Sequence, residues 1–192
     1  MNKFESKYIK TSNKMCEALV SLLETKDFEY ISIKEICSKA NINRSTFYLH
    51  YETTRDLLEE VIDKLEHSFS ESFLHESLDV NSPTVQSKDL FLITDKYLLP
   101  YLSFIRSNKK VFKAAIKNPN TFNLDKRYIN MCDLYFVPIL KRYGVTDEEQ
   151  KYVLNFYING IFSIIKLWIG NDCDMENEAI SKIIKKCINY TL

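Results

Sequence analysis

Apolar residues recur three and four positions apart along most of this chain, the spacing that gathers them on one face of an α-helix. The most regular stretch runs from residue 153 to 168, with its apolar stripe at Val153, Phe156, Tyr157, Gly160, Ile161, Ile164, Ile165 and Trp168. Three Gly and four Pro in 192 residues favour long helices over a turn-rich β architecture. The pattern predicts an all-α fold of about nine helices.

Residues 32–58 predict two short helices, a tight turn and the start of a third helix. Ser32 and Glu35 have the spacing of a capping box, in which each side chain satisfies a free N–H at the helix start. Asn-Ile-Asn at 41–43 breaks the pattern, because Asn tolerates left-handed backbone and also caps helices. One helix therefore ends at Asn41 and the next begins at Asn43.

The second short helix, from Arg44 to about Tyr51, is too short to be stable alone. Phe47 and Tyr51 lie four positions apart and are predicted to face inwards. The outward residues are mostly hydrogen-bond donors: Arg44, Ser45, Thr46, Tyr48 and His50. A cap formed by Thr53 and Asp56 opens the next helix. A short helix that is held by its neighbours and presents donors is typical of the recognition helix of a helix-turn-helix.

Four segments of this stretch carry a family resemblance: ICSKA at 36–40, NIN at 41–43, TFYLHY at 46–51 and TRDL at 54–57. In spacing and residue type they resemble the DNA-binding signature of the TetR/AcrR family of bacterial regulators, and more finely its DhaS-like branch. Asn41 replaces the usual turn Gly. Thr54 stands where the family usually has a phosphate-binding Lys, so Arg55 is the candidate substitute.

The resemblance implies an N-terminal DNA-binding site. The candidate residues are Lys34, Arg44, Ser45, Thr46, Tyr48, Leu49, His50, Thr54 and Arg55. Backbone phosphates would be met by Lys34, by the start of the third helix, and by Tyr48 and His50. Base edges would be read by the remaining recognition-helix residues, since Arg can bridge two guanine acceptors and Thr or Leu can contact a thymine methyl. Tyr48 has a second reading as a core residue.

Local charge matters more than the total, because a formal net charge of zero alone argues against a nucleic-acid partner. Residues 1–14 carry four lysines against one glutamate, and residues 34–55 carry two lysines and two arginines against two glutamates. A dimer would double this modest positive charge on one face.

We expect two domains, with residues 1–54 forming the three-helix DNA-binding domain and residues 55–192 forming a helical bundle for dimerisation and effector binding. The predicted dimer interface comprises Phe156, Gly160, Ile161, Ile164, Trp168, Ile180, Ile184 and Ile188. Mid-helix Gly160 supports close helix approach, or else it makes room for an internal side chain. A candidate pocket for a small apolar or aromatic effector comprises Phe104, Phe112, Tyr128, Tyr135, Phe136, Phe156 and Tyr157, although such stripes also form ordinary cores.

Other classes of function find little support. The sequence has no Gly-rich phosphate loop, no GxSxG and no HExxH, so we expect no enzyme and no cofactor. The three histidines and five scattered cysteines lack metal-ligand spacing, so we expect no metal site and no disulfide framework. No signal-like or membrane-spanning run is evident, which predicts a cytoplasmic protein without membrane association.

These expectations combine into a homodimeric transcriptional repressor that binds a palindromic operator in double-stranded DNA and is released by a small-molecule effector. One alternative is a helical adaptor regulator that lacks a ligand and acts through a protein partner. A helical enzyme with a structural helix-turn-helix is a second rival, but the sequence offers it no set of catalytic groups. The sequence names neither the operator nor the effector, and it leaves the sign of regulation open.

Overall fold

The computed structural model describes residues 3–74, 93–124, 126, 130 and 136–189. Within these residues the chain forms nine α-helices and one 3-10 helix, and it has no strand. The expectation of an all-α fold with about nine helices is confirmed. The predicted pocket residues Tyr128 and Tyr135 lie outside the described part of the chain.

The chain divides into two compact units. The first unit comprises Met1–Ser68 together with Lys110–Phe122, and the second comprises Phe69–Lys109 together with Asn123–Leu192. The helix that follows the predicted helix-turn-helix thus contributes to both units, and a segment from the middle of the chain joins the first. The expected boundary after residue 54 remains a prediction about function, whereas the packing itself divides later.

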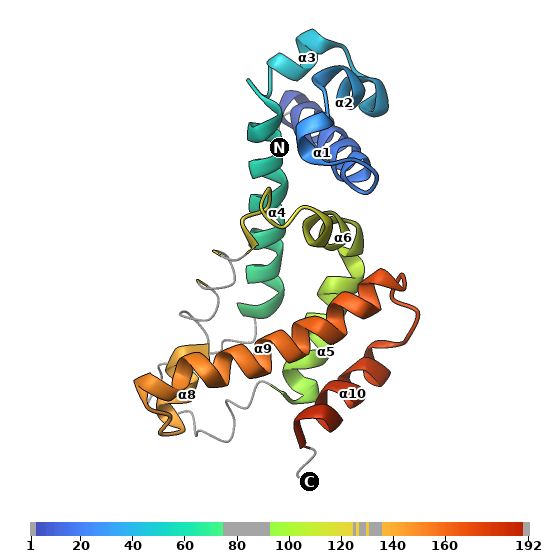
Figure 1. Ribbon diagram of the computed structural model, residues 1–192. Helices are drawn as coiled ribbons and strands as arrows, with labels where there is room; N and C mark the ends of the chain where they lie inside the picture. The colour runs from blue at the N-terminus through green and yellow to red at the C-terminus, as the bar shows by residue number, and fades with distance from the viewer. Residues whose placement is uncertain (1–2, 75–92, 125, 127–129, 131–135, 190–192) are drawn as a thin grey trace. The chain divides into compact units, whose positions relative to one another are not determined.

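The first unit holds the predicted helix-turn-helix, and Figure 1 shows α1, α2 and α3 grouped around the first turns of α4. Its elements are α1 (Lys3–Leu23), the 3-10 helix η1 (Phe28–Tyr30), α2 (Ile33–Ala40), α3 (Arg44–Tyr48), the first part of α4 (Thr54–Leu74) and most of α6 (Lys109–Lys117). The largest fully buried side chains of its core are Met15, Leu19, Leu23, Ile36, Phe47, Leu57 and Leu58. They come from four helices, so packing supplies the stability that each short helix lacks.

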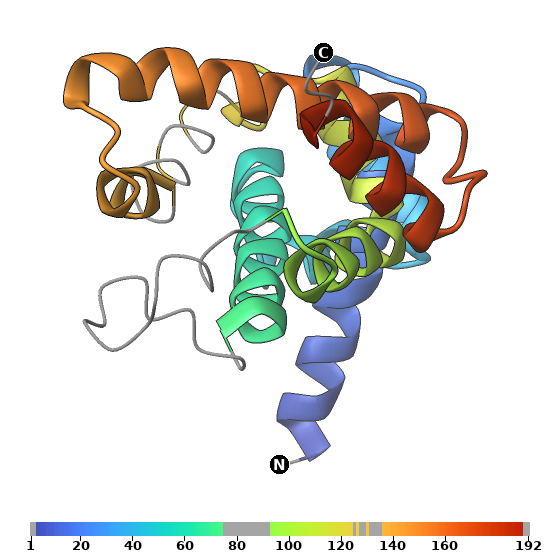
Figure 2. The same cartoon turned by 90° about the horizontal axis from the view of Figure 1, so that it is seen from below.

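The second unit contains α5 (Asp95–Ser107), α8 (Val137–Arg142), α9 (Asp147–Gly170) and α10 (Asn177–Asn189). In Figures 1 and 2, α10 lies beside α9, and it also packs on α5. Its largest fully buried side chains are Leu102, Ile105, Trp168, Ile169 and Ile184. Arg106 ties α5 to the α9–α10 turn, because its Nη2 donates to the Cys173 carbonyl at 3.2 Å and its Nη1 pairs with Glu176 at 2.6 Å.

Two prolines lie within helices of the second unit. Pro100 is inside α5, at the sixth of its 13 residues, where its ring removes one N–H from the helix. Pro138 is in the first turn of α8, where its fixed φ suits a helix start, and residues 131–135 before this helix lie outside the described part of the chain. A capping box of Thr146 with Glu149 opens α9.

Candidate nucleic-acid interface

Local capping fixes where α2 begins and ends. The Ser32 side chain accepts from the Glu35 N–H while the Glu35 side chain accepts from the Ser32 N–H, which is the expected capping box. Lys26 and these capping contacts hold the pKa of the Glu35 carboxyl at about 2. Asn41 is left-handed, with φ 53° and ψ 54°, and the following Ile42 N–H bonds to the Cys37 carbonyl at 3.0 Å. The turn therefore uses Asn where a Gly would be easier.

The recognition helix α3 is shorter than expected, since it ends at Tyr48 and the chain continues as a hydrogen-bonded turn to Tyr51. The N–H groups of His50 and Tyr51 both bond to the Phe47 carbonyl at 2.9 Å. Phe47 is fully buried and Tyr51 is buried, so the predicted inward face is confirmed. Asn43 occupies the N-cap position, but its side chain makes no capping hydrogen bond.

The outward residues differ in their exposure. Tyr48 is 57% exposed and Leu49 is 77% exposed, which excludes the reading of Tyr48 as a core residue. Arg44, Ser45 and the more distant Lys34 are also exposed, whereas Thr46, His50 and Thr54 are half-buried. Leu49, directly after α3, is thus a large apolar side chain exposed to solvent, while Phe47 on the other side of the segment is fully buried.

Arg55 has contacts within its own unit. Its Nη1 donates to the Thr121 carbonyl at 3.1 Å, and its guanidinium lies over the Phe28 ring at 5.1 Å from the centroid. The cap that starts α4 is as expected, because the Asp56 side chain accepts from the Thr53 N–H at 2.8 Å. Arg55 is exposed, and these two contacts fix the orientation of its guanidinium. The guanidinium has further N–H donors that could bind another group.

His50 is stacked on a residue that the motif does not contain. The rings of Tyr8 in α1 and His50 lie 3.9 Å apart between centroids, at an interplanar angle of 21°. The His50 Nδ1 atom is buried and has no hydrogen-bond partner among the described residues. Burial lowers the pKa of the His50 imidazole below its ordinary value of 6.5. Burial therefore favours the neutral form of the ring.

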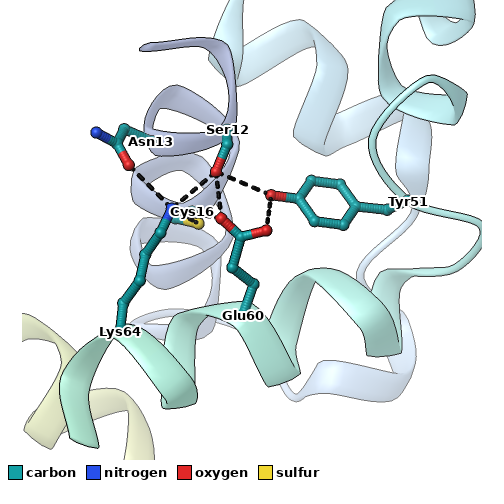
Figure 3. A network of polar contacts seen from close by, with 6 residues as sticks. All are labelled: Ser12, Asn13, Cys16, Tyr51, Glu60 and Lys64. Carbon is teal, nitrogen blue, oxygen red and sulfur yellow. Dashed lines mark hydrogen bonds and ion pairs between the residues drawn. The ribbon is translucent and has the colours of Figure 1, made fainter. Parts of the chain in front are cut away.

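A polar network joins α1, α4 and the end of the recognition segment (Figure 3). The Tyr51 hydroxyl donates to Glu60 Oε2 at 2.7 Å, and the Ser12 hydroxyl donates to the other oxygen of the same carboxylate. Lys64 Nζ lies 2.5 Å from Glu60 Oε1 and donates to Ser12 Oγ at 2.7 Å. Asn13 and Cys16 also accept from Lys64.

The charges in this network stabilise one another. Burial alone would raise the pKa of Glu60, but hydrogen bonds from Lys64, Ser12 and Tyr51 outweigh burial and hold that pKa below its usual value of 4.5. Burial likewise opposes the charge on Lys64, yet the Glu60 carboxylate raises the pKa of Lys64 overall. Both groups are charged at neutral pH, as a partly buried pair with satisfied hydrogen bonds can be.

Tyr8, Ser12, Glu60 and Lys64 were not among the residues predicted from the sequence. Two signals in the sequence could have pointed to three of them. Ser12 is a polar residue on the otherwise apolar inner face of α1, and it is 3% exposed. Glu60 and Lys64 stand four positions apart in one helix, the spacing of an ion pair. Nothing in the sequence, however, indicates that Tyr8 reaches a histidine 42 positions away.

The predicted dimer-interface residues fall into two groups. Phe156 is 70% exposed and Gly160 is exposed, while Ile161, Ile164 and Ile188 are half-buried. Trp168, Ile180 and Ile184 lie in the core of the second unit, with at most 3% exposed, so a partner subunit does not reach them there. The predicted apolar residues were numerous enough to form both a core and a dimer interface, and these three residues belong to the core.

The outer face of α9 is apolar and uncovered. Tyr152 and Phe156 are each 70% exposed and Leu167 is 67% exposed. A Cβ atom added at Gly160 would meet no atom within 4 Å, so this glycine makes no room for a side chain among the described residues. By length and composition α9 could cross a membrane, but a single such helix is weak support for that role.

The structure describes five of the seven predicted pocket residues, and these five are divided between the two units. Phe104 is buried in the second unit, whereas the half-buried Phe112 belongs to the first. Phe136 is half-buried, and Tyr157 is 37% exposed. Phe156 is too exposed to line the interior of a single chain. No group of three or more His, Cys, Asp or Glu residues able to hold a metal is found in the described part of the chain.

Comparison with known families matches both halves of the chain. The family described as "Bacterial regulatory proteins, tetR family" matches residues 16–61, which span the C-terminal part of α1 through the first turns of α4. The family described as "Transcriptional regulator C-terminal region" matches residues 94–190. The matched ranges include α2, α3, Tyr51 and Glu60, whereas Tyr8, Ser12, Asn13 and Lys64 lie outside both of them.

Individual relatives agree with this assignment. An HTH-type transcriptional regulator of Bacillus subtilis, the uncharacterised YxbF, is 24% identical over 173 residues, which are 90% of this chain but 43% of that protein. The crystal structure of a TetR-like regulator from Rhodococcus sp. RHA1 has a TM-score of 0.64 at 15% identity, covering 92% of each chain. The dihydroxyacetone kinase operon activator DhaS is 18% identical, covering 93% of this chain and 92% of that one, with a TM-score of 0.47. This last score is too low to support the DhaS-like branch, which remains a prediction.

Proposed function

The chain belongs to the TetR family of bacterial transcriptional regulators, and we propose on that premise that it binds a palindromic operator as a homodimer and represses transcription. The observation that carries the proposal is the outward face of α3 and the turn after it. There, Tyr48 and Leu49 are exposed while Phe47 is fully buried. The chain acts by binding rather than by catalysis, and it works in the cytoplasm, where the DNA is.

Phosphate contacts set the register of the complex and much of its affinity. We assign them to Tyr48, His50, Lys34 and the N-terminal end of α4, where Thr54 and Arg55 lie. The Tyr48 hydroxyl and the Lys34 amine are on exposed side chains, so they meet a phosphate without rearrangement of the fold.

Base contacts set the sequence preference. We assign them to Arg44, Ser45, Thr46 and Leu49 on the exposed side of the recognition segment. The Arg44 guanidinium suits the two acceptors of a guanine in the major groove, and the Leu49 side chain suits a thymine methyl. The half-buried Thr46 offers both a hydroxyl and a methyl.

The proposed dimer uses the outer face of α9. Tyr152, Phe156, Gly160 and Leu167 lie three to four positions apart or at multiples of that spacing, so they form one stripe that a second copy of α9 would cover. The open surroundings of Gly160 support this assignment, because close approach of a partner helix compensates for a mid-helix glycine. Ile161, Ile164 and Ile188 border the stripe, whereas Trp168, Ile180 and Ile184 support it from inside.

Release from the operator by an effector is the part of the proposal that rests on the fewest observations. A small apolar or aromatic effector would bind within the second unit, near Phe104 and Phe136. It would act by changing the separation of the two recognition helices, because half-sites must match a helical turn of DNA. The alternative is a regulator without a ligand that acts through a protein partner.

Two experiments test these functions. A reporter gene behind the operator should be transcribed less when the protein is supplied, and higher transcription would make the protein an activator. A thermal-shift screen with small apolar and aromatic compounds separates the ligand sensor from the adaptor. A compound that raises the melting temperature and lowers operator affinity supports the sensor, while a screen without any such compound favours the adaptor.

A further inference from the structure

Two neighbouring residues at the end of the recognition segment are held by α1. His50 is held by a ring stack with Tyr8, and Tyr51 is held by its hydroxyl through Ser12 and Glu60. The helix that these residues follow has only five residues, Arg44–Tyr48. Because a helix so short has little stability of its own, its direction depends on what holds its two ends.

The contact of Tyr8 with His50 is notable because Tyr8 is otherwise a surface residue. Tyr8 is 46% exposed, so the core does not need its ring. Its ring is nevertheless parallel to that of His50 within 21°, and the centroids are 3.9 Å apart. A stack of this kind changes an equilibrium constant by a factor of about 2 to 12. Such a factor affects DNA affinity if the stack favours the conformation that binds DNA.

The placement of His50 also bears on which of its two nitrogens can meet a phosphate. Nδ1 is buried without a partner among the described residues, so a proton there would be a buried, unsatisfied N–H. Nε2 is therefore the nitrogen that would donate to a phosphate in the proposed complex. The charged groups that act on this ring are Glu60 and Lys64 of α4, and they oppose each other.

The second contact works through a carboxylate with several donors. Glu60 accepts from Tyr51 and Ser12 and is paired with Lys64. Any movement of the recognition segment away from α1 would break the Tyr51 hydrogen bond and separate the buried Tyr51 hydroxyl from its carboxylate acceptor. Networks that are fully satisfied hold one geometry more strictly than apolar packing does.

We propose that the first half of α1 is a positioning element for the recognition helix, in which Tyr8 holds His50 and Ser12, with Glu60, holds Tyr51. These residues then set operator affinity without touching DNA. The inference rests on the proposed function, since it concerns how that function's DNA-binding face is held. The inference adds positioning residues that are not among the residues proposed to contact DNA.

The first test uses the full-length protein and a series at Tyr8. Tyr8→Ala should lower operator affinity at least about fivefold, because each subunit of a dimer loses one stack. Tyr8→Phe keeps the ring and should bind like the wild type. Ile9→Ala is the matched control, since Ile9 is the next residue and is similarly exposed at 44%. Fluorescence anisotropy with a labelled operator duplex measures all four proteins.

The same series has a readout that does not depend on DNA. In Tyr8→Ala the uncovered His50 imidazole should titrate closer to 6.5, as followed by NMR of its ring protons, whereas Tyr8→Phe should leave the titration unchanged. The inference is overturned if Tyr8→Ala binds the operator like the wild type, or if Tyr8→Phe loses as much affinity as Tyr8→Ala. A wild type without any preferred sequence would instead overturn the proposed function, and the inference with it.

The second test separates positioning from stability at Tyr51. Tyr51→Phe removes one hydroxyl from the network, and Tyr143→Phe, at a residue 46% exposed, is the control. Measured well below the melting temperature, Tyr51→Phe should bind the operator several-fold more weakly and exchange its His50 and Tyr51 amide protons faster. A lower melting temperature with unchanged operator affinity would make the network structural only and would overturn the inference for Tyr51.

Discussion

Tyr48 and Arg44 are both exposed on α3, yet substitutions at the two positions should change DNA binding in different ways. Tyr48→Phe removes a hydroxyl assigned to a phosphate, so it should weaken binding to all sequences alike. Arg44→Ala removes a base contact, so it should relax the preference at one position of each half-site at about 1–3 kcal/mol. Binding-site selection with both variants measures this difference. A change of base preference with Tyr48→Phe but not with Arg44→Ala would reverse the assigned faces.

Arg55 tests whether a residue with internal contacts also meets DNA. Its Nη1 is bonded to the Thr121 carbonyl, but the guanidinium has further donors for a phosphate. Arg55→Gln should lower the slope of log affinity against log salt by about one unit per subunit. Lys182→Gln on α10 removes the same charge far along the chain and is the control. An unchanged slope together with a lower melting temperature would confine Arg55 to its contacts with Phe28 and Thr121.

At the residue scale, prediction from sequence succeeds where the signal is local. The inward placement of Phe47 and Tyr51 follows from their spacing of four, and the left-handed Asn41 follows from the chemistry of its side chain. The stack of Tyr8 on His50 could not be predicted, because helical spacing says which face a residue is on and not which distant residue it meets.

At the scale of elements, the network between α1 and α4 should make stability depend on pH. The Glu60 pKa is lower in the folded protein than its ordinary 4.5, so its stabilising contribution is present above that value and is lost as pH falls through the folded pKa. Glu60→Gln should therefore lower the free energy of unfolding at pH 7 by about 1–2 kcal/mol, the modest figure reflecting partial solvent exposure.

Urea unfolding of the wild type and Glu60→Gln between neutral and acid pH measures this dependence. The difference between the two proteins should shrink as the wild-type carboxylate becomes protonated. Asp63→Gln, at an exposed residue of the same helix, should show no such convergence. A difference that stays constant with pH would mean that the Glu60 charge does not contribute to the network.

The ends of helices could be predicted from the sequence better than the neighbours against which each helix packs. The capping boxes at Ser32 and Thr146 are local patterns that can be read from residue spacing, and both form. The sequence also indicates how wide the apolar stripe of α9 is, but it does not indicate which part of the stripe faces the core. Trp168 and Phe156 belong to the same apolar pattern, yet one is 2% and the other 70% exposed. Only the packing of α5 and α10 on this helix decides between them.

At the scale of the whole molecule, the outer stripe of α9 should determine the oligomeric state. Phe156→Glu combined with Leu167→Glu places charges on two exposed positions, so the chain should still fold but should no longer dimerise. Met175→Glu alters an exposed apolar residue outside α9, at 40% exposure, and is the control. Light scattering should give a monomer for the double variant and a dimer for the control. A double variant that remains a dimer would place the interface elsewhere.

The central claim is that two recognition helices of a homodimer read a two-fold symmetric operator. Selection of bound duplexes from a random DNA pool by the full-length protein tests this claim most directly. The enriched sequences should contain two inverted half-sites whose centres are about 10 base pairs apart, or a multiple of that spacing, because each helix enters the major groove on one face of the duplex. Enrichment of a single unpaired half-site, or of no sequence at all, would contradict it.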